Sequence, residues 1–298
     1  MSAKEPTAAT SGTFLVGGDL PVHRLGYGTM RLVGEGAWGE PADAAAAHRV
    51  LRRAVELGVT LIDTADAYGP EIAERLIAEA LYPYPPGLVI ATKGGITRQG
   101  PARTEYVGRA GYLIQCVEMS LRRLKLECFD LYQLHRIDPK TPLDESLGAL
   151  RKMQEQGKIR HIGLSEVTPS QIVQAERIVD VVTVQNRYSL ADRRHEETLK
   201  YCERQRIGFL PWYPLAAGKL LRPEHPAAPT LAQLAARHGA TVAQLSIAWL
   251  LQKAPMMMPI PGTSTVAHLE ENVAAARLRL GPEEWAEVEA AAGTKIAP

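Results

Sequence analysis

The stretch that decides the fold class of this chain is Val59-Thr60-Leu61-Ile62-Asp63-Thr64-Ala65-Asp66-Ala67-Tyr68-Gly69. Its first four residues are apolar or β-branched and predict a short buried strand. A polar loop follows, and the apolar periodicity from Ile72 to Leu81 then predicts a helix. The stretch is therefore one strand–loop–helix unit, and the rest of the chain repeats its pattern.

The same alternation extends in both directions from this unit. Apolar runs predict further strands at 24–28, 88–92, 129–134, 159–164, 181–184, 207–210 and 257–260. Helical periodicity appears at 44–57, 112–124, 145–156, 170–179, 196–206, 231–238, 241–253, 266–276 and 282–291. Eight strands that alternate with helices predict parallel strands joined by right-handed crossovers. The predicted fold class is α/β, a (β/α)8 TIM barrel with extra helices near the C-terminus.

The N-terminal residues precede this pattern. Phe14-Leu15-Val16 and the run from Leu20 to His23 flank Gly17-Gly18-Asp19, which predicts a β-hairpin. Residues 1–11 are small and polar and predict a disordered tail, so residues 12–298 are expected to form a single domain. A doubly wound open sheet is the alternative fold. It is disfavoured because no G-x-G-x-x-G motif follows a strand and no break in composition divides the chain.

The bulk composition argues against several kinds of partner. The chain has 298 residues, a formal net charge of +1 and 46% hydrophobic residues, a balance that does not favour nucleic-acid binding. Cys116, Cys128 and Cys202 have neither disulfide nor metal-site spacing, so we expect no metal and a reducing, cytoplasmic location. No apolar run approaches the roughly 20 residues of a membrane span, and no signal peptide is recognisable. A monomer is expected, because no heptad pattern or long apolar patch predicts association.

Polar residues gather where the predicted strands end, which is where (β/α)8 barrels place their chemistry. These ends are Gly28-Thr29-Met30, the run from Asp63 to Gly69, Lys93-Gly94-Gly95, His135-Arg136, Ser165-Glu166, Gln185-Asn186, Trp212-Tyr213-Pro214 and Pro261-Gly262-Thr263-Ser264. Any one of them is ordinary in a structural loop. The ordered set Asp63, Tyr68, Lys93 and His135 indicates a catalytic site.

These motifs carry a resemblance to a known family. Leu25-Gly26-Tyr27-Gly28-Thr29-Met30, Asp63-Thr64-Ala65, Tyr68-Gly69, Thr92-Lys93, Leu134-His135, Gly163-Leu164-Ser165, Val184-Gln185-Asn186, Ile260-Pro261-Gly262 and Glu271-Asn272-Val273 resemble the signature set of the aldo-keto reductases. The resemblance covers about residues 14–291 and is greatest for the bacterial pyridoxal-reductase-like branch. It implies a (β/α)8 barrel, in agreement with the strand pattern.

The resemblance implies NADPH-dependent reduction of an aldehyde or ketone to an alcohol, with pyridoxal as the leading specific substrate. Tyr68 would donate the proton. Lys93 is the ammonium expected to lower the pKa of Tyr68 from about 10, since a neighbouring cation favours the phenolate. Asp63 would hold Lys93, and His135 would orient the carbonyl oxygen. The substrate pocket is expected to include Arg136 and Trp38, the latter either lining the pocket or anchoring its own loop.

The expected cofactor is NADPH, with NADH left open, and its contacts follow from the same resemblance. Ser165, Glu166 and Gln185 would hold the carboxamide, although many family members have Asn at the position of Glu166, and an ionised Glu can only accept hydrogen bonds. Trp212 would stack on the nicotinamide. At the adenosine end, Gly262 and His268 stand where basic residues are common. The remaining expected cofactor contacts are Gly28, Thr29, Met30, Tyr213, Pro214, Leu215, Gly218, Lys219, Thr263, Ser264, Glu271 and Asn272.

Two other functional classes remain open at this point. A Schiff-base lyase on the same barrel would use Lys93 as its amine nucleophile. A regulatory subunit would bind the cofactor with little turnover. The four clustered residues favour the reductase over both.

Overall fold

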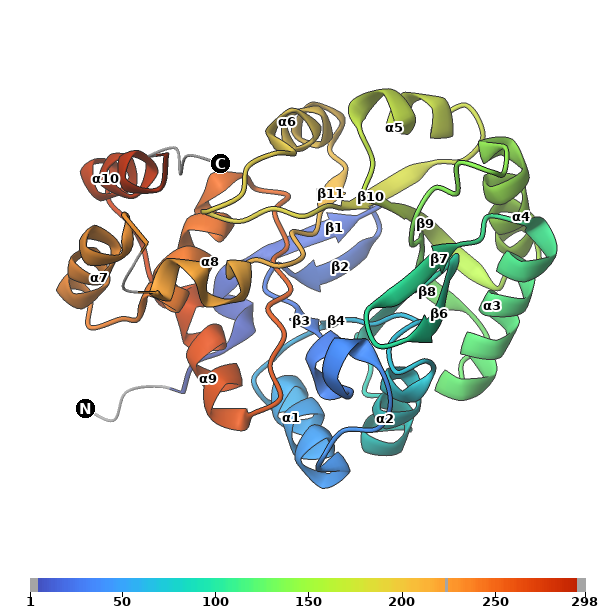
Figure 1. Ribbon diagram of the computed structural model, residues 1–298, viewed down its shortest axis with the longest axis horizontal. Coiled ribbons are helices and arrows are strands. Elements are labelled where there is room, and N and C mark those ends of the chain that lie inside the picture. The colour runs from blue at the N-terminus through green and yellow to red at the C-terminus, as the bar shows by residue number, and fades with distance from the viewer. Residues whose placement is uncertain (1–4, 223–224, 294–298) are drawn as a thin grey trace.

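Seven parallel strands curl into one sheet, in the order β11-β10-β9-β8-β5-β4-β3, in the computed structural model, which describes residues 5–222 and 225–293 (Figure 1). The strands are β3 (Tyr27–Gly28), β4 (Leu61–Asp63), β5 (Val89–Gly94), β8 (Phe129–Leu134), β9 (Ile159–Ser165), β10 (Val181–Gln185) and β11 (Gly208–Phe209). All seven run the same way, so their C-terminal ends meet at one rim.

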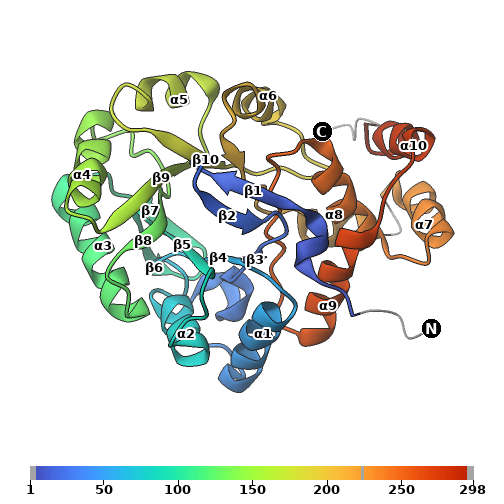
Figure 2. The same cartoon turned by 180° about the vertical axis from the view of Figure 1, so that it is seen from behind.

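Helices cover the outside of the sheet, and both views show them as an outer ring (Figures 1 and 2). They are α1 (Ala44–Glu56), α2 (Ile72–Leu81), α3 (Ala110–Leu124), α4 (Leu143–Glu155), α5 (Pro169–Ala175), α6 (Glu196–Gln205), α7 (Ala228–Arg237), α8 (Val242–Lys253), α9 (Val266–Ala274) and α10 (Pro282–Gly293). Helices α7 and α10 pack against each other beside α8 and are the extra helices expected near the C-terminus. Among the described residues, no helix has the length and apolar character needed to cross a membrane.

Residues 257–260 occupy the eighth position of the barrel without forming a regular strand. The Met258 amide donates to the Phe209 carbonyl at 2.8 Å, and the Gly26 amide donates to the Pro259 carbonyl at 3.0 Å. This segment therefore joins β11 to the residues before β3 and closes the sheet into a barrel. Pro259 and Pro261 lack backbone N–H groups, which explains why the segment makes only part of a strand ladder. The predicted (β/α)8 fold is confirmed.

The predicted N-terminal hairpin is also present. It consists of β1 (Thr13–Val16) and β2 (Leu20–His23), and Gly17 and Gly18 in its turn have positive φ angles of 62° and 85°. Val16, Leu20 and Val22 pack with barrel residues that include Leu61 and Leu131. The hairpin thus fills the N-terminal end of the barrel with apolar side chains, and Figure 2 shows it across that end. The opposite rim is left for the site.

The disordered tail expected over residues 1–11 is wrong for residues 8–11. These form the 3-10 helix η1 (Ala8–Ser11), and the Ala8 amide donates to the Leu57 carbonyl at 2.8 Å. Ser11 is buried, and its hydroxyl accepts from the Leu25 amide at 2.9 Å. These contacts with the barrel order the segment. Residues 1–4 lie outside the described residues.

A β-hairpin that follows β5 was not predicted from the sequence. Strands β6 (Ile96–Gly100) and β7 (Arg103–Tyr106) form an antiparallel hairpin that belongs to neither the barrel nor its helices. Short 3-10 helices η2 (Met30–Leu32) and η3 (Glu35–Ala37) follow β3, and η4 (Ala216–Leu221) and η5 (Ala275–Arg277) lie further along the chain. The β6–β7 hairpin, η2 and η3 lie over the C-terminal rim (Figure 1).

Candidate active site

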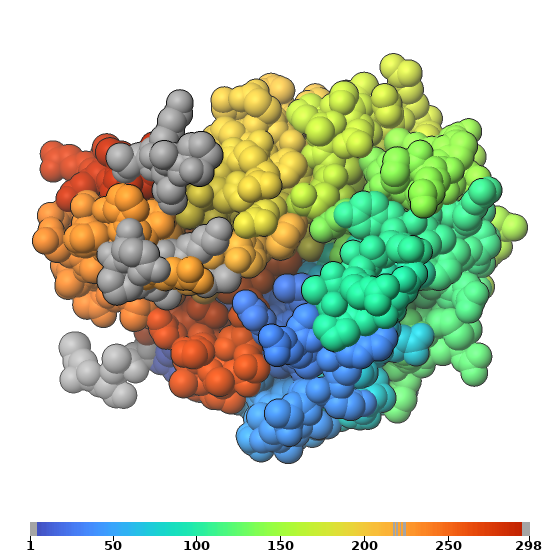
Figure 3. All heavy atoms as spheres, in the orientation of Figure 1, coloured from blue at the N-terminus to red at the C-terminus, as the bar shows by residue number. Residues whose placement is uncertain are grey.

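A cavity of about 350 Å³ opens at the C-terminal rim of the barrel. The space-filling view shows this face hollowed near its centre, where the blue N-terminal segments meet the gold and orange ones (Figure 3). The predicted site residues that line it are Gly28, Met30, Asp63, Tyr68, His135, Arg136, Ser165, Gln185, Trp212, Tyr213, Pro214, Leu215, Gly218 and Gly262. Residues from seven separate strand ends thus converge on one cavity.

Lys93, Asp63 and Tyr68 form a connected buried group beneath this cavity. The Lys93 ammonium donates to Asp63 Oδ2 at 2.7 Å, to the Thr64 carbonyl at 2.7 Å and to Tyr68 Oη at 3.4 Å. Lys93 is 0% exposed and Asp63 2%, so the ion pair is removed from solvent. The sequence places them there because Asp63 ends β4, Lys93 lies near the end of the adjacent β5, and the loop after β4 returns Tyr68 above them.

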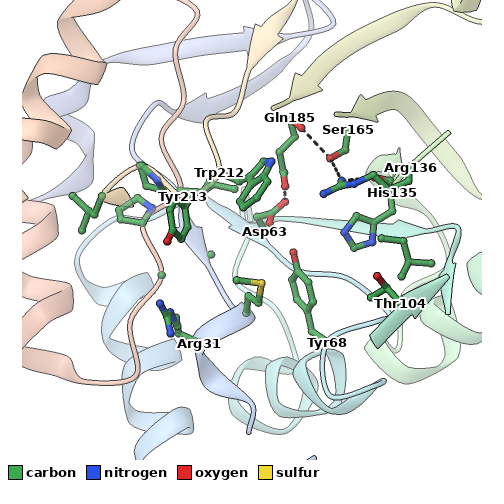
Figure 4. Close-up of a pocket in the computed structure, with 18 of the residues that line it drawn as sticks. Arg31, Asp63, Tyr68, Thr104, His135, Arg136, Ser165, Gln185, Trp212 and Tyr213 are labelled. Carbon is green, nitrogen blue, oxygen red and sulfur yellow. Dashed lines mark hydrogen bonds between the residues drawn. The ribbon is translucent and has the colours of Figure 1, made fainter. Parts of the chain in front are cut away.

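The second carboxylate oxygen of Asp63 is also hydrogen-bonded. Asp63 Oδ1 accepts from Gln185 Nε2 at 2.7 Å and from Gln133 Nε2 at 3.4 Å. Figure 4 shows Gln185 reaching down to Asp63 from above. A buried ion pair is tolerated only when its remaining hydrogen-bonding capacity is filled, and the two amides fill it here. Gln133, on β8, is a supporting residue that the sequence pattern did not reveal.

The pKa of Tyr68 differs in direction from the sequence expectation. Burial raises the pKa of Tyr68 above 10 and the Asp63 carboxylate adds to that effect, whereas the Lys93 ammonium opposes it. The expected lowering by Lys93 is thus outweighed by desolvation, which disfavours the phenolate. The Asp63 carboxylate raises the pKa of Lys93 against the opposing effect of burial, so the amine stays protonated. Tyr68 therefore keeps its proton at neutral pH.

His135 stands beside Tyr68 as an uncharged imidazole. The two rings meet edge to face with centroids 6.0 Å apart. Burial holds the pKa of His135 well below 6.5, and the cations Lys93, Arg136 and Arg98 add to that effect. An uncharged imidazole can donate one hydrogen bond to a carbonyl oxygen in the cavity.

Arg136, Ser165 and Gln185 form a second network at the rim, drawn with dashed lines in Figure 4. Arg136 Nη1 donates to the His135 carbonyl at 2.6 Å and to Ser165 Oγ at 2.8 Å. Ser165 Oγ donates in turn to the Gln185 carbonyl at 2.9 Å. These bonds fix the orientation of Arg136 next to His135.

Glu166 does not line the cavity, although it was expected to contact the cofactor. Its Oε1 accepts from the Trp212 indole N–H at 2.6 Å and from the Arg187 amide at 2.6 Å. Burial acts to raise the pKa of Glu166, but hydrogen bonds from His195, the Arg187 amide and Trp212 lower it to about 2. The carboxylate is therefore ionised, and it holds Trp212 from behind the cavity wall.

Other expected contacts lie outside the cavity lining. Thr29 is buried and donates to the Asp63 carbonyl, Glu271 accepts from Thr241, and Trp38 is 38% exposed with its backbone bridged to Gly69. Thr263 and Asn272 are buried, and Ser264 and His268 are exposed near the start of α9. The Lys219 side chain lies outside the described part of the chain. Trp38 thus belongs to its own loop and not to the pocket.

Seven lining residues were not predicted, namely Arg31, Ile96, Arg98, Thr104, Tyr106, Ile260 and Pro261. Four of them come from the β6–β7 hairpin. Its signal was present in the sequence, because Gly100-Pro101 separates two short polar and β-branched runs, a pattern typical of a hairpin turn.

The residues that line the cavity suit a nicotinamide cofactor. Trp212 and Tyr213 are half-buried aromatic residues in the cavity wall, suited to stacking. A Cβ at Gly262 would lie 2.7 Å from the Gly28 carbonyl oxygen, so glycine there allows the two backbone segments to approach, and the same Cβ would lie 3.5 Å from Arg31 Cγ. Arg31 therefore lies beside Gly262 and adds a basic residue to the cavity lining. Aromatic faces and a cation in the same lining suit the rings and the phosphates of such a cofactor.

Comparisons with known proteins agree with this geometry. The Aldo/keto reductase family model matches residues 24–292. An uncharacterized oxidoreductase of Schizosaccharomyces pombe is 47% identical over 282 residues, which cover 95% of this chain and 90% of that protein. The pyridoxine 4-dehydrogenase of Escherichia coli is 41% identical over 280 residues, covering 92% and 96%. An aldo-keto reductase from Klebsiella pneumoniae, solved in complex with NADPH, superposes with a TM-score of 0.80 at 28% identity, covering 93% and 94%.

The family match spans nearly the whole chain, and two close relatives extend over almost their full lengths. This match accounts for the barrel, for the buried lysine–carboxylate pair with its tyrosine, and for the aromatic cavity wall. The chain belongs to the aldo/keto reductase family and is an NAD(P)H-dependent oxidoreductase.

Proposed function

We propose that this protein reduces small aldehydes or ketones to alcohols with NADPH, and that Tyr68 supplies the proton. The observation that carries the proposal is the buried Asp63–Lys93–Tyr68 group, which opens with His135 onto one cavity. Pyridoxal, reduced to pyridoxine, is the leading substrate, and the relative named pyridoxine 4-dehydrogenase supports it.

Each residue has a separate role in the proposed reaction. The reduced nicotinamide supplies the hydride, because no protein side chain can. Tyr68, whose raised pKa keeps its hydroxyl protonated, gives its proton to the oxygen that becomes the alcohol. Lys93 stabilises the resulting phenolate, and Asp63 keeps Lys93 charged and in place. Neutral His135 donates a hydrogen bond to the same oxygen and orients it.

Trp212, Ser165 and Gln185 are the residues proposed to hold the nicotinamide. NADPH is preferred over NADH in this proposal because Arg31 adds a cation beside Gly262, and because a related structure was solved with NADPH. The lyase alternative is disfavoured. Lys93 is fully buried and its pKa is raised, so the amine is neither accessible nor deprotonated.

The test is the Tyr68→Phe variant, assayed by NADPH oxidation with pyridoxal and with a panel of aldehydes. We expect kcat to fall by about 10³-fold, within the roughly 10²- to 10⁴-fold contribution of general acids. The Kd for NADPH should change less than about threefold, because the phenol is not a nicotinamide-binding group in this proposal.

Tyr106→Phe is the matched control. It removes another tyrosine hydroxyl from the same cavity wall, and it should leave kcat within a few-fold of the native value. A fully active Tyr68→Phe variant would overturn the assignment of the proton donor. Tight NADPH binding without turnover of any carbonyl would favour the regulatory-subunit alternative.

We also infer a cytoplasmic monomer. Cys116, Cys128 and Cys202 are free thiols, which is typical of proteins from a reducing compartment. Light scattering of the purified protein checks its mass, and cell fractionation checks its location.

A further inference from the structure

The cavity contains unpaired positive charge. Arg31, Arg98 and Arg136 all line it, and none of them forms an ion pair with a carboxylate of the described residues. The acidic residue in the described lining is Asp63, and Lys93 already neutralises it. The whole chain has a formal net charge of only +1, so this local excess is not a general property of the molecule.

The three arginines serve two parts of the cavity. Arg31 lies beside Gly262, on the side proposed for the cofactor, and Figure 4 shows it below Tyr213. Arg136 and Arg98 lie at the other end. Figure 4 shows Arg136 beside His135, and below them Thr104, which pairs with Arg98 across the β6–β7 hairpin. Both arginines lower the pKa of His135, and Arg136 also acts to lower that of Tyr68. Two cations therefore flank the place where the carbonyl would react.

Both of these guanidinium groups are held by hydrogen bonds from the chain itself. Arg98 donates from Nε to the Ala67 carbonyl at 2.8 Å and from Nη1 to the Gly36 carbonyl at 3.0 Å. Arg136 donates from Nη1 to the His135 carbonyl and to Ser165 Oγ. None of these bonds uses Nη2 of either arginine. Fixed guanidinium donors that line a cavity suit an oxyanion, since carboxylates and phosphates accept their N–H groups in matching geometry.

We propose that the preferred substrate carries an anionic group, a carboxylate or a phosphate, in addition to its carbonyl, and that Arg98 and Arg136 bind that group. The inference rests on the proposed reductase function but not on pyridoxal as its substrate, because pyridoxal has neither of these anionic groups. Neutral aldehydes still react, because the Tyr68 group acts on the carbonyl alone, but they lose the contacts to both arginines.

The test compares paired aldehydes at saturating NADPH. 4-Formylbenzoate is paired with the neutral 4-formylbenzamide, and pyridoxal 5′-phosphate is paired with pyridoxal. We expect the anionic member to have a kcat/KM at least about tenfold higher in one pair, and the preference to shrink as salt is added. A preference in the first pair indicates that the arginines bind a carboxylate, and a preference in the second pair indicates that they bind a phosphate.

Variants assign the preference to residues. Arg98→Gln and Arg136→Gln should each lower the anionic-to-neutral ratio of kcat/KM by about fivefold or more, and Arg98→Lys should restore part of it. A variant that only disturbs the structure would lower kcat/KM equally for both aldehydes of a pair and leave their ratio unchanged. Arg103→Gln is the matched control, because it removes an exposed arginine of the same hairpin that does not line the cavity, and it should leave the ratio unchanged.

The possible outcomes separate this inference from the function on which it rests. Turnover of neutral and anionic aldehydes with equal kcat/KM overturns the inference and leaves the reductase in place. A preference that persists in both Arg98→Gln and Arg136→Gln overturns the assignment to these arginines. If none of the four aldehydes is reduced, both the inference and the proposed function are wrong.

Discussion

Glu166 illustrates how a single side chain acts through another one. Its carboxylate accepts hydrogen bonds from the indole of Trp212 and the amide of Arg187, both at 2.6 Å. Hydrogen bonds to an ionised acceptor are worth about 1.5–3 kcal/mol, more than neutral ones. Trp212 lines the cavity, and Glu166 lies behind it. Glu166 is therefore a positioning residue for the aromatic wall.

We predict that Glu166→Ala raises the Kd for NADPH by about tenfold, because Trp212 loses the bond that orients its ring. The change in kcat should be smaller, since Tyr68 and Lys93 are not contacted. Fluorescence titration with NADPH measures the Kd, and steady-state assays measure kcat.

A double-mutant cycle with Trp212→Phe provides the control. Phenylalanine has no N–H group to donate, so adding Glu166→Ala in that background should change the Kd little. Fully additive effects would show that Glu166 acts independently of Trp212.

One face of the β6–β7 hairpin lines the cavity. Ile96 pairs with Tyr106 and Arg98 pairs with Thr104, and all four residues line the cavity. Alternate residues of a strand point to opposite sides, so the Thr97–Glu105 pair faces away from the cavity. The hairpin is a two-stranded ribbon outside the barrel, and it can be shortened without cutting the barrel ladder.

We predict that replacing residues 98–104 with Asn-Gly shortens the hairpin to a two-residue turn between Thr97 and Glu105. Loss of Arg98 and Thr104 should raise the KM for the carbonyl substrate by about tenfold or more. The Kd for NADPH should stay within about threefold, because the proposed cofactor contacts come from other elements. Glu105 is exposed, so Glu105→Gln should leave both the KM for the carbonyl substrate and the Kd for NADPH unchanged. An equal loss of cofactor binding in the shortened protein would show that the hairpin also serves the cofactor.

A buried carboxyl group, that of Asp66, lowers the stability of the whole molecule. Asp66 is 8% exposed, and its Oδ1 has no hydrogen-bond partner among the described residues. Burial, together with the nearby Glu74 carboxylate, raises the pKa of Asp66 from 3.8 to about 7. A carboxyl whose pKa is higher in the folded state binds more protons there between about pH 4 and 7, so the free energy of unfolding falls as pH rises through that window.

We predict that Asp66→Asn stabilises the protein, and more so at pH 8 than at pH 5. The raised pKa of Asp66 lowers the free energy of unfolding by on the order of 4 kcal/mol above pH 7 and by about a third of that at pH 5. Thermal unfolding at both pH values, followed by circular dichroism, should show a gain in Tm of about 5 °C or more at pH 8. Asp180→Asn, at an exposed carboxyl, is the control, and equal gains at both pH values would show that Asp66 is not the titrating group.

The sequence by itself determined the barrel and led to the residues proposed to be catalytic. Strand and helix periods are local properties, so alternating apolar runs were enough to predict parallel strands and crossover helices. Because the C-terminal ends of such strands meet at one rim, position along the chain alone brought Asp63, Lys93 and His135 together. Tyr68 followed from its place in the loop after Asp63.

Only the tertiary structure decided how these groups behave. It determined that burial outweighs Lys93 in setting the pKa of Tyr68, that Glu166 bonds Trp212, and that Arg98 reaches the cavity from an unpredicted hairpin. The order of residues 8–11 likewise depends on contacts with Leu57 and Leu25. The physical reason is common to all four cases, because desolvation and partners distant in sequence exist only once the chain has folded, and no local pattern encodes their magnitude.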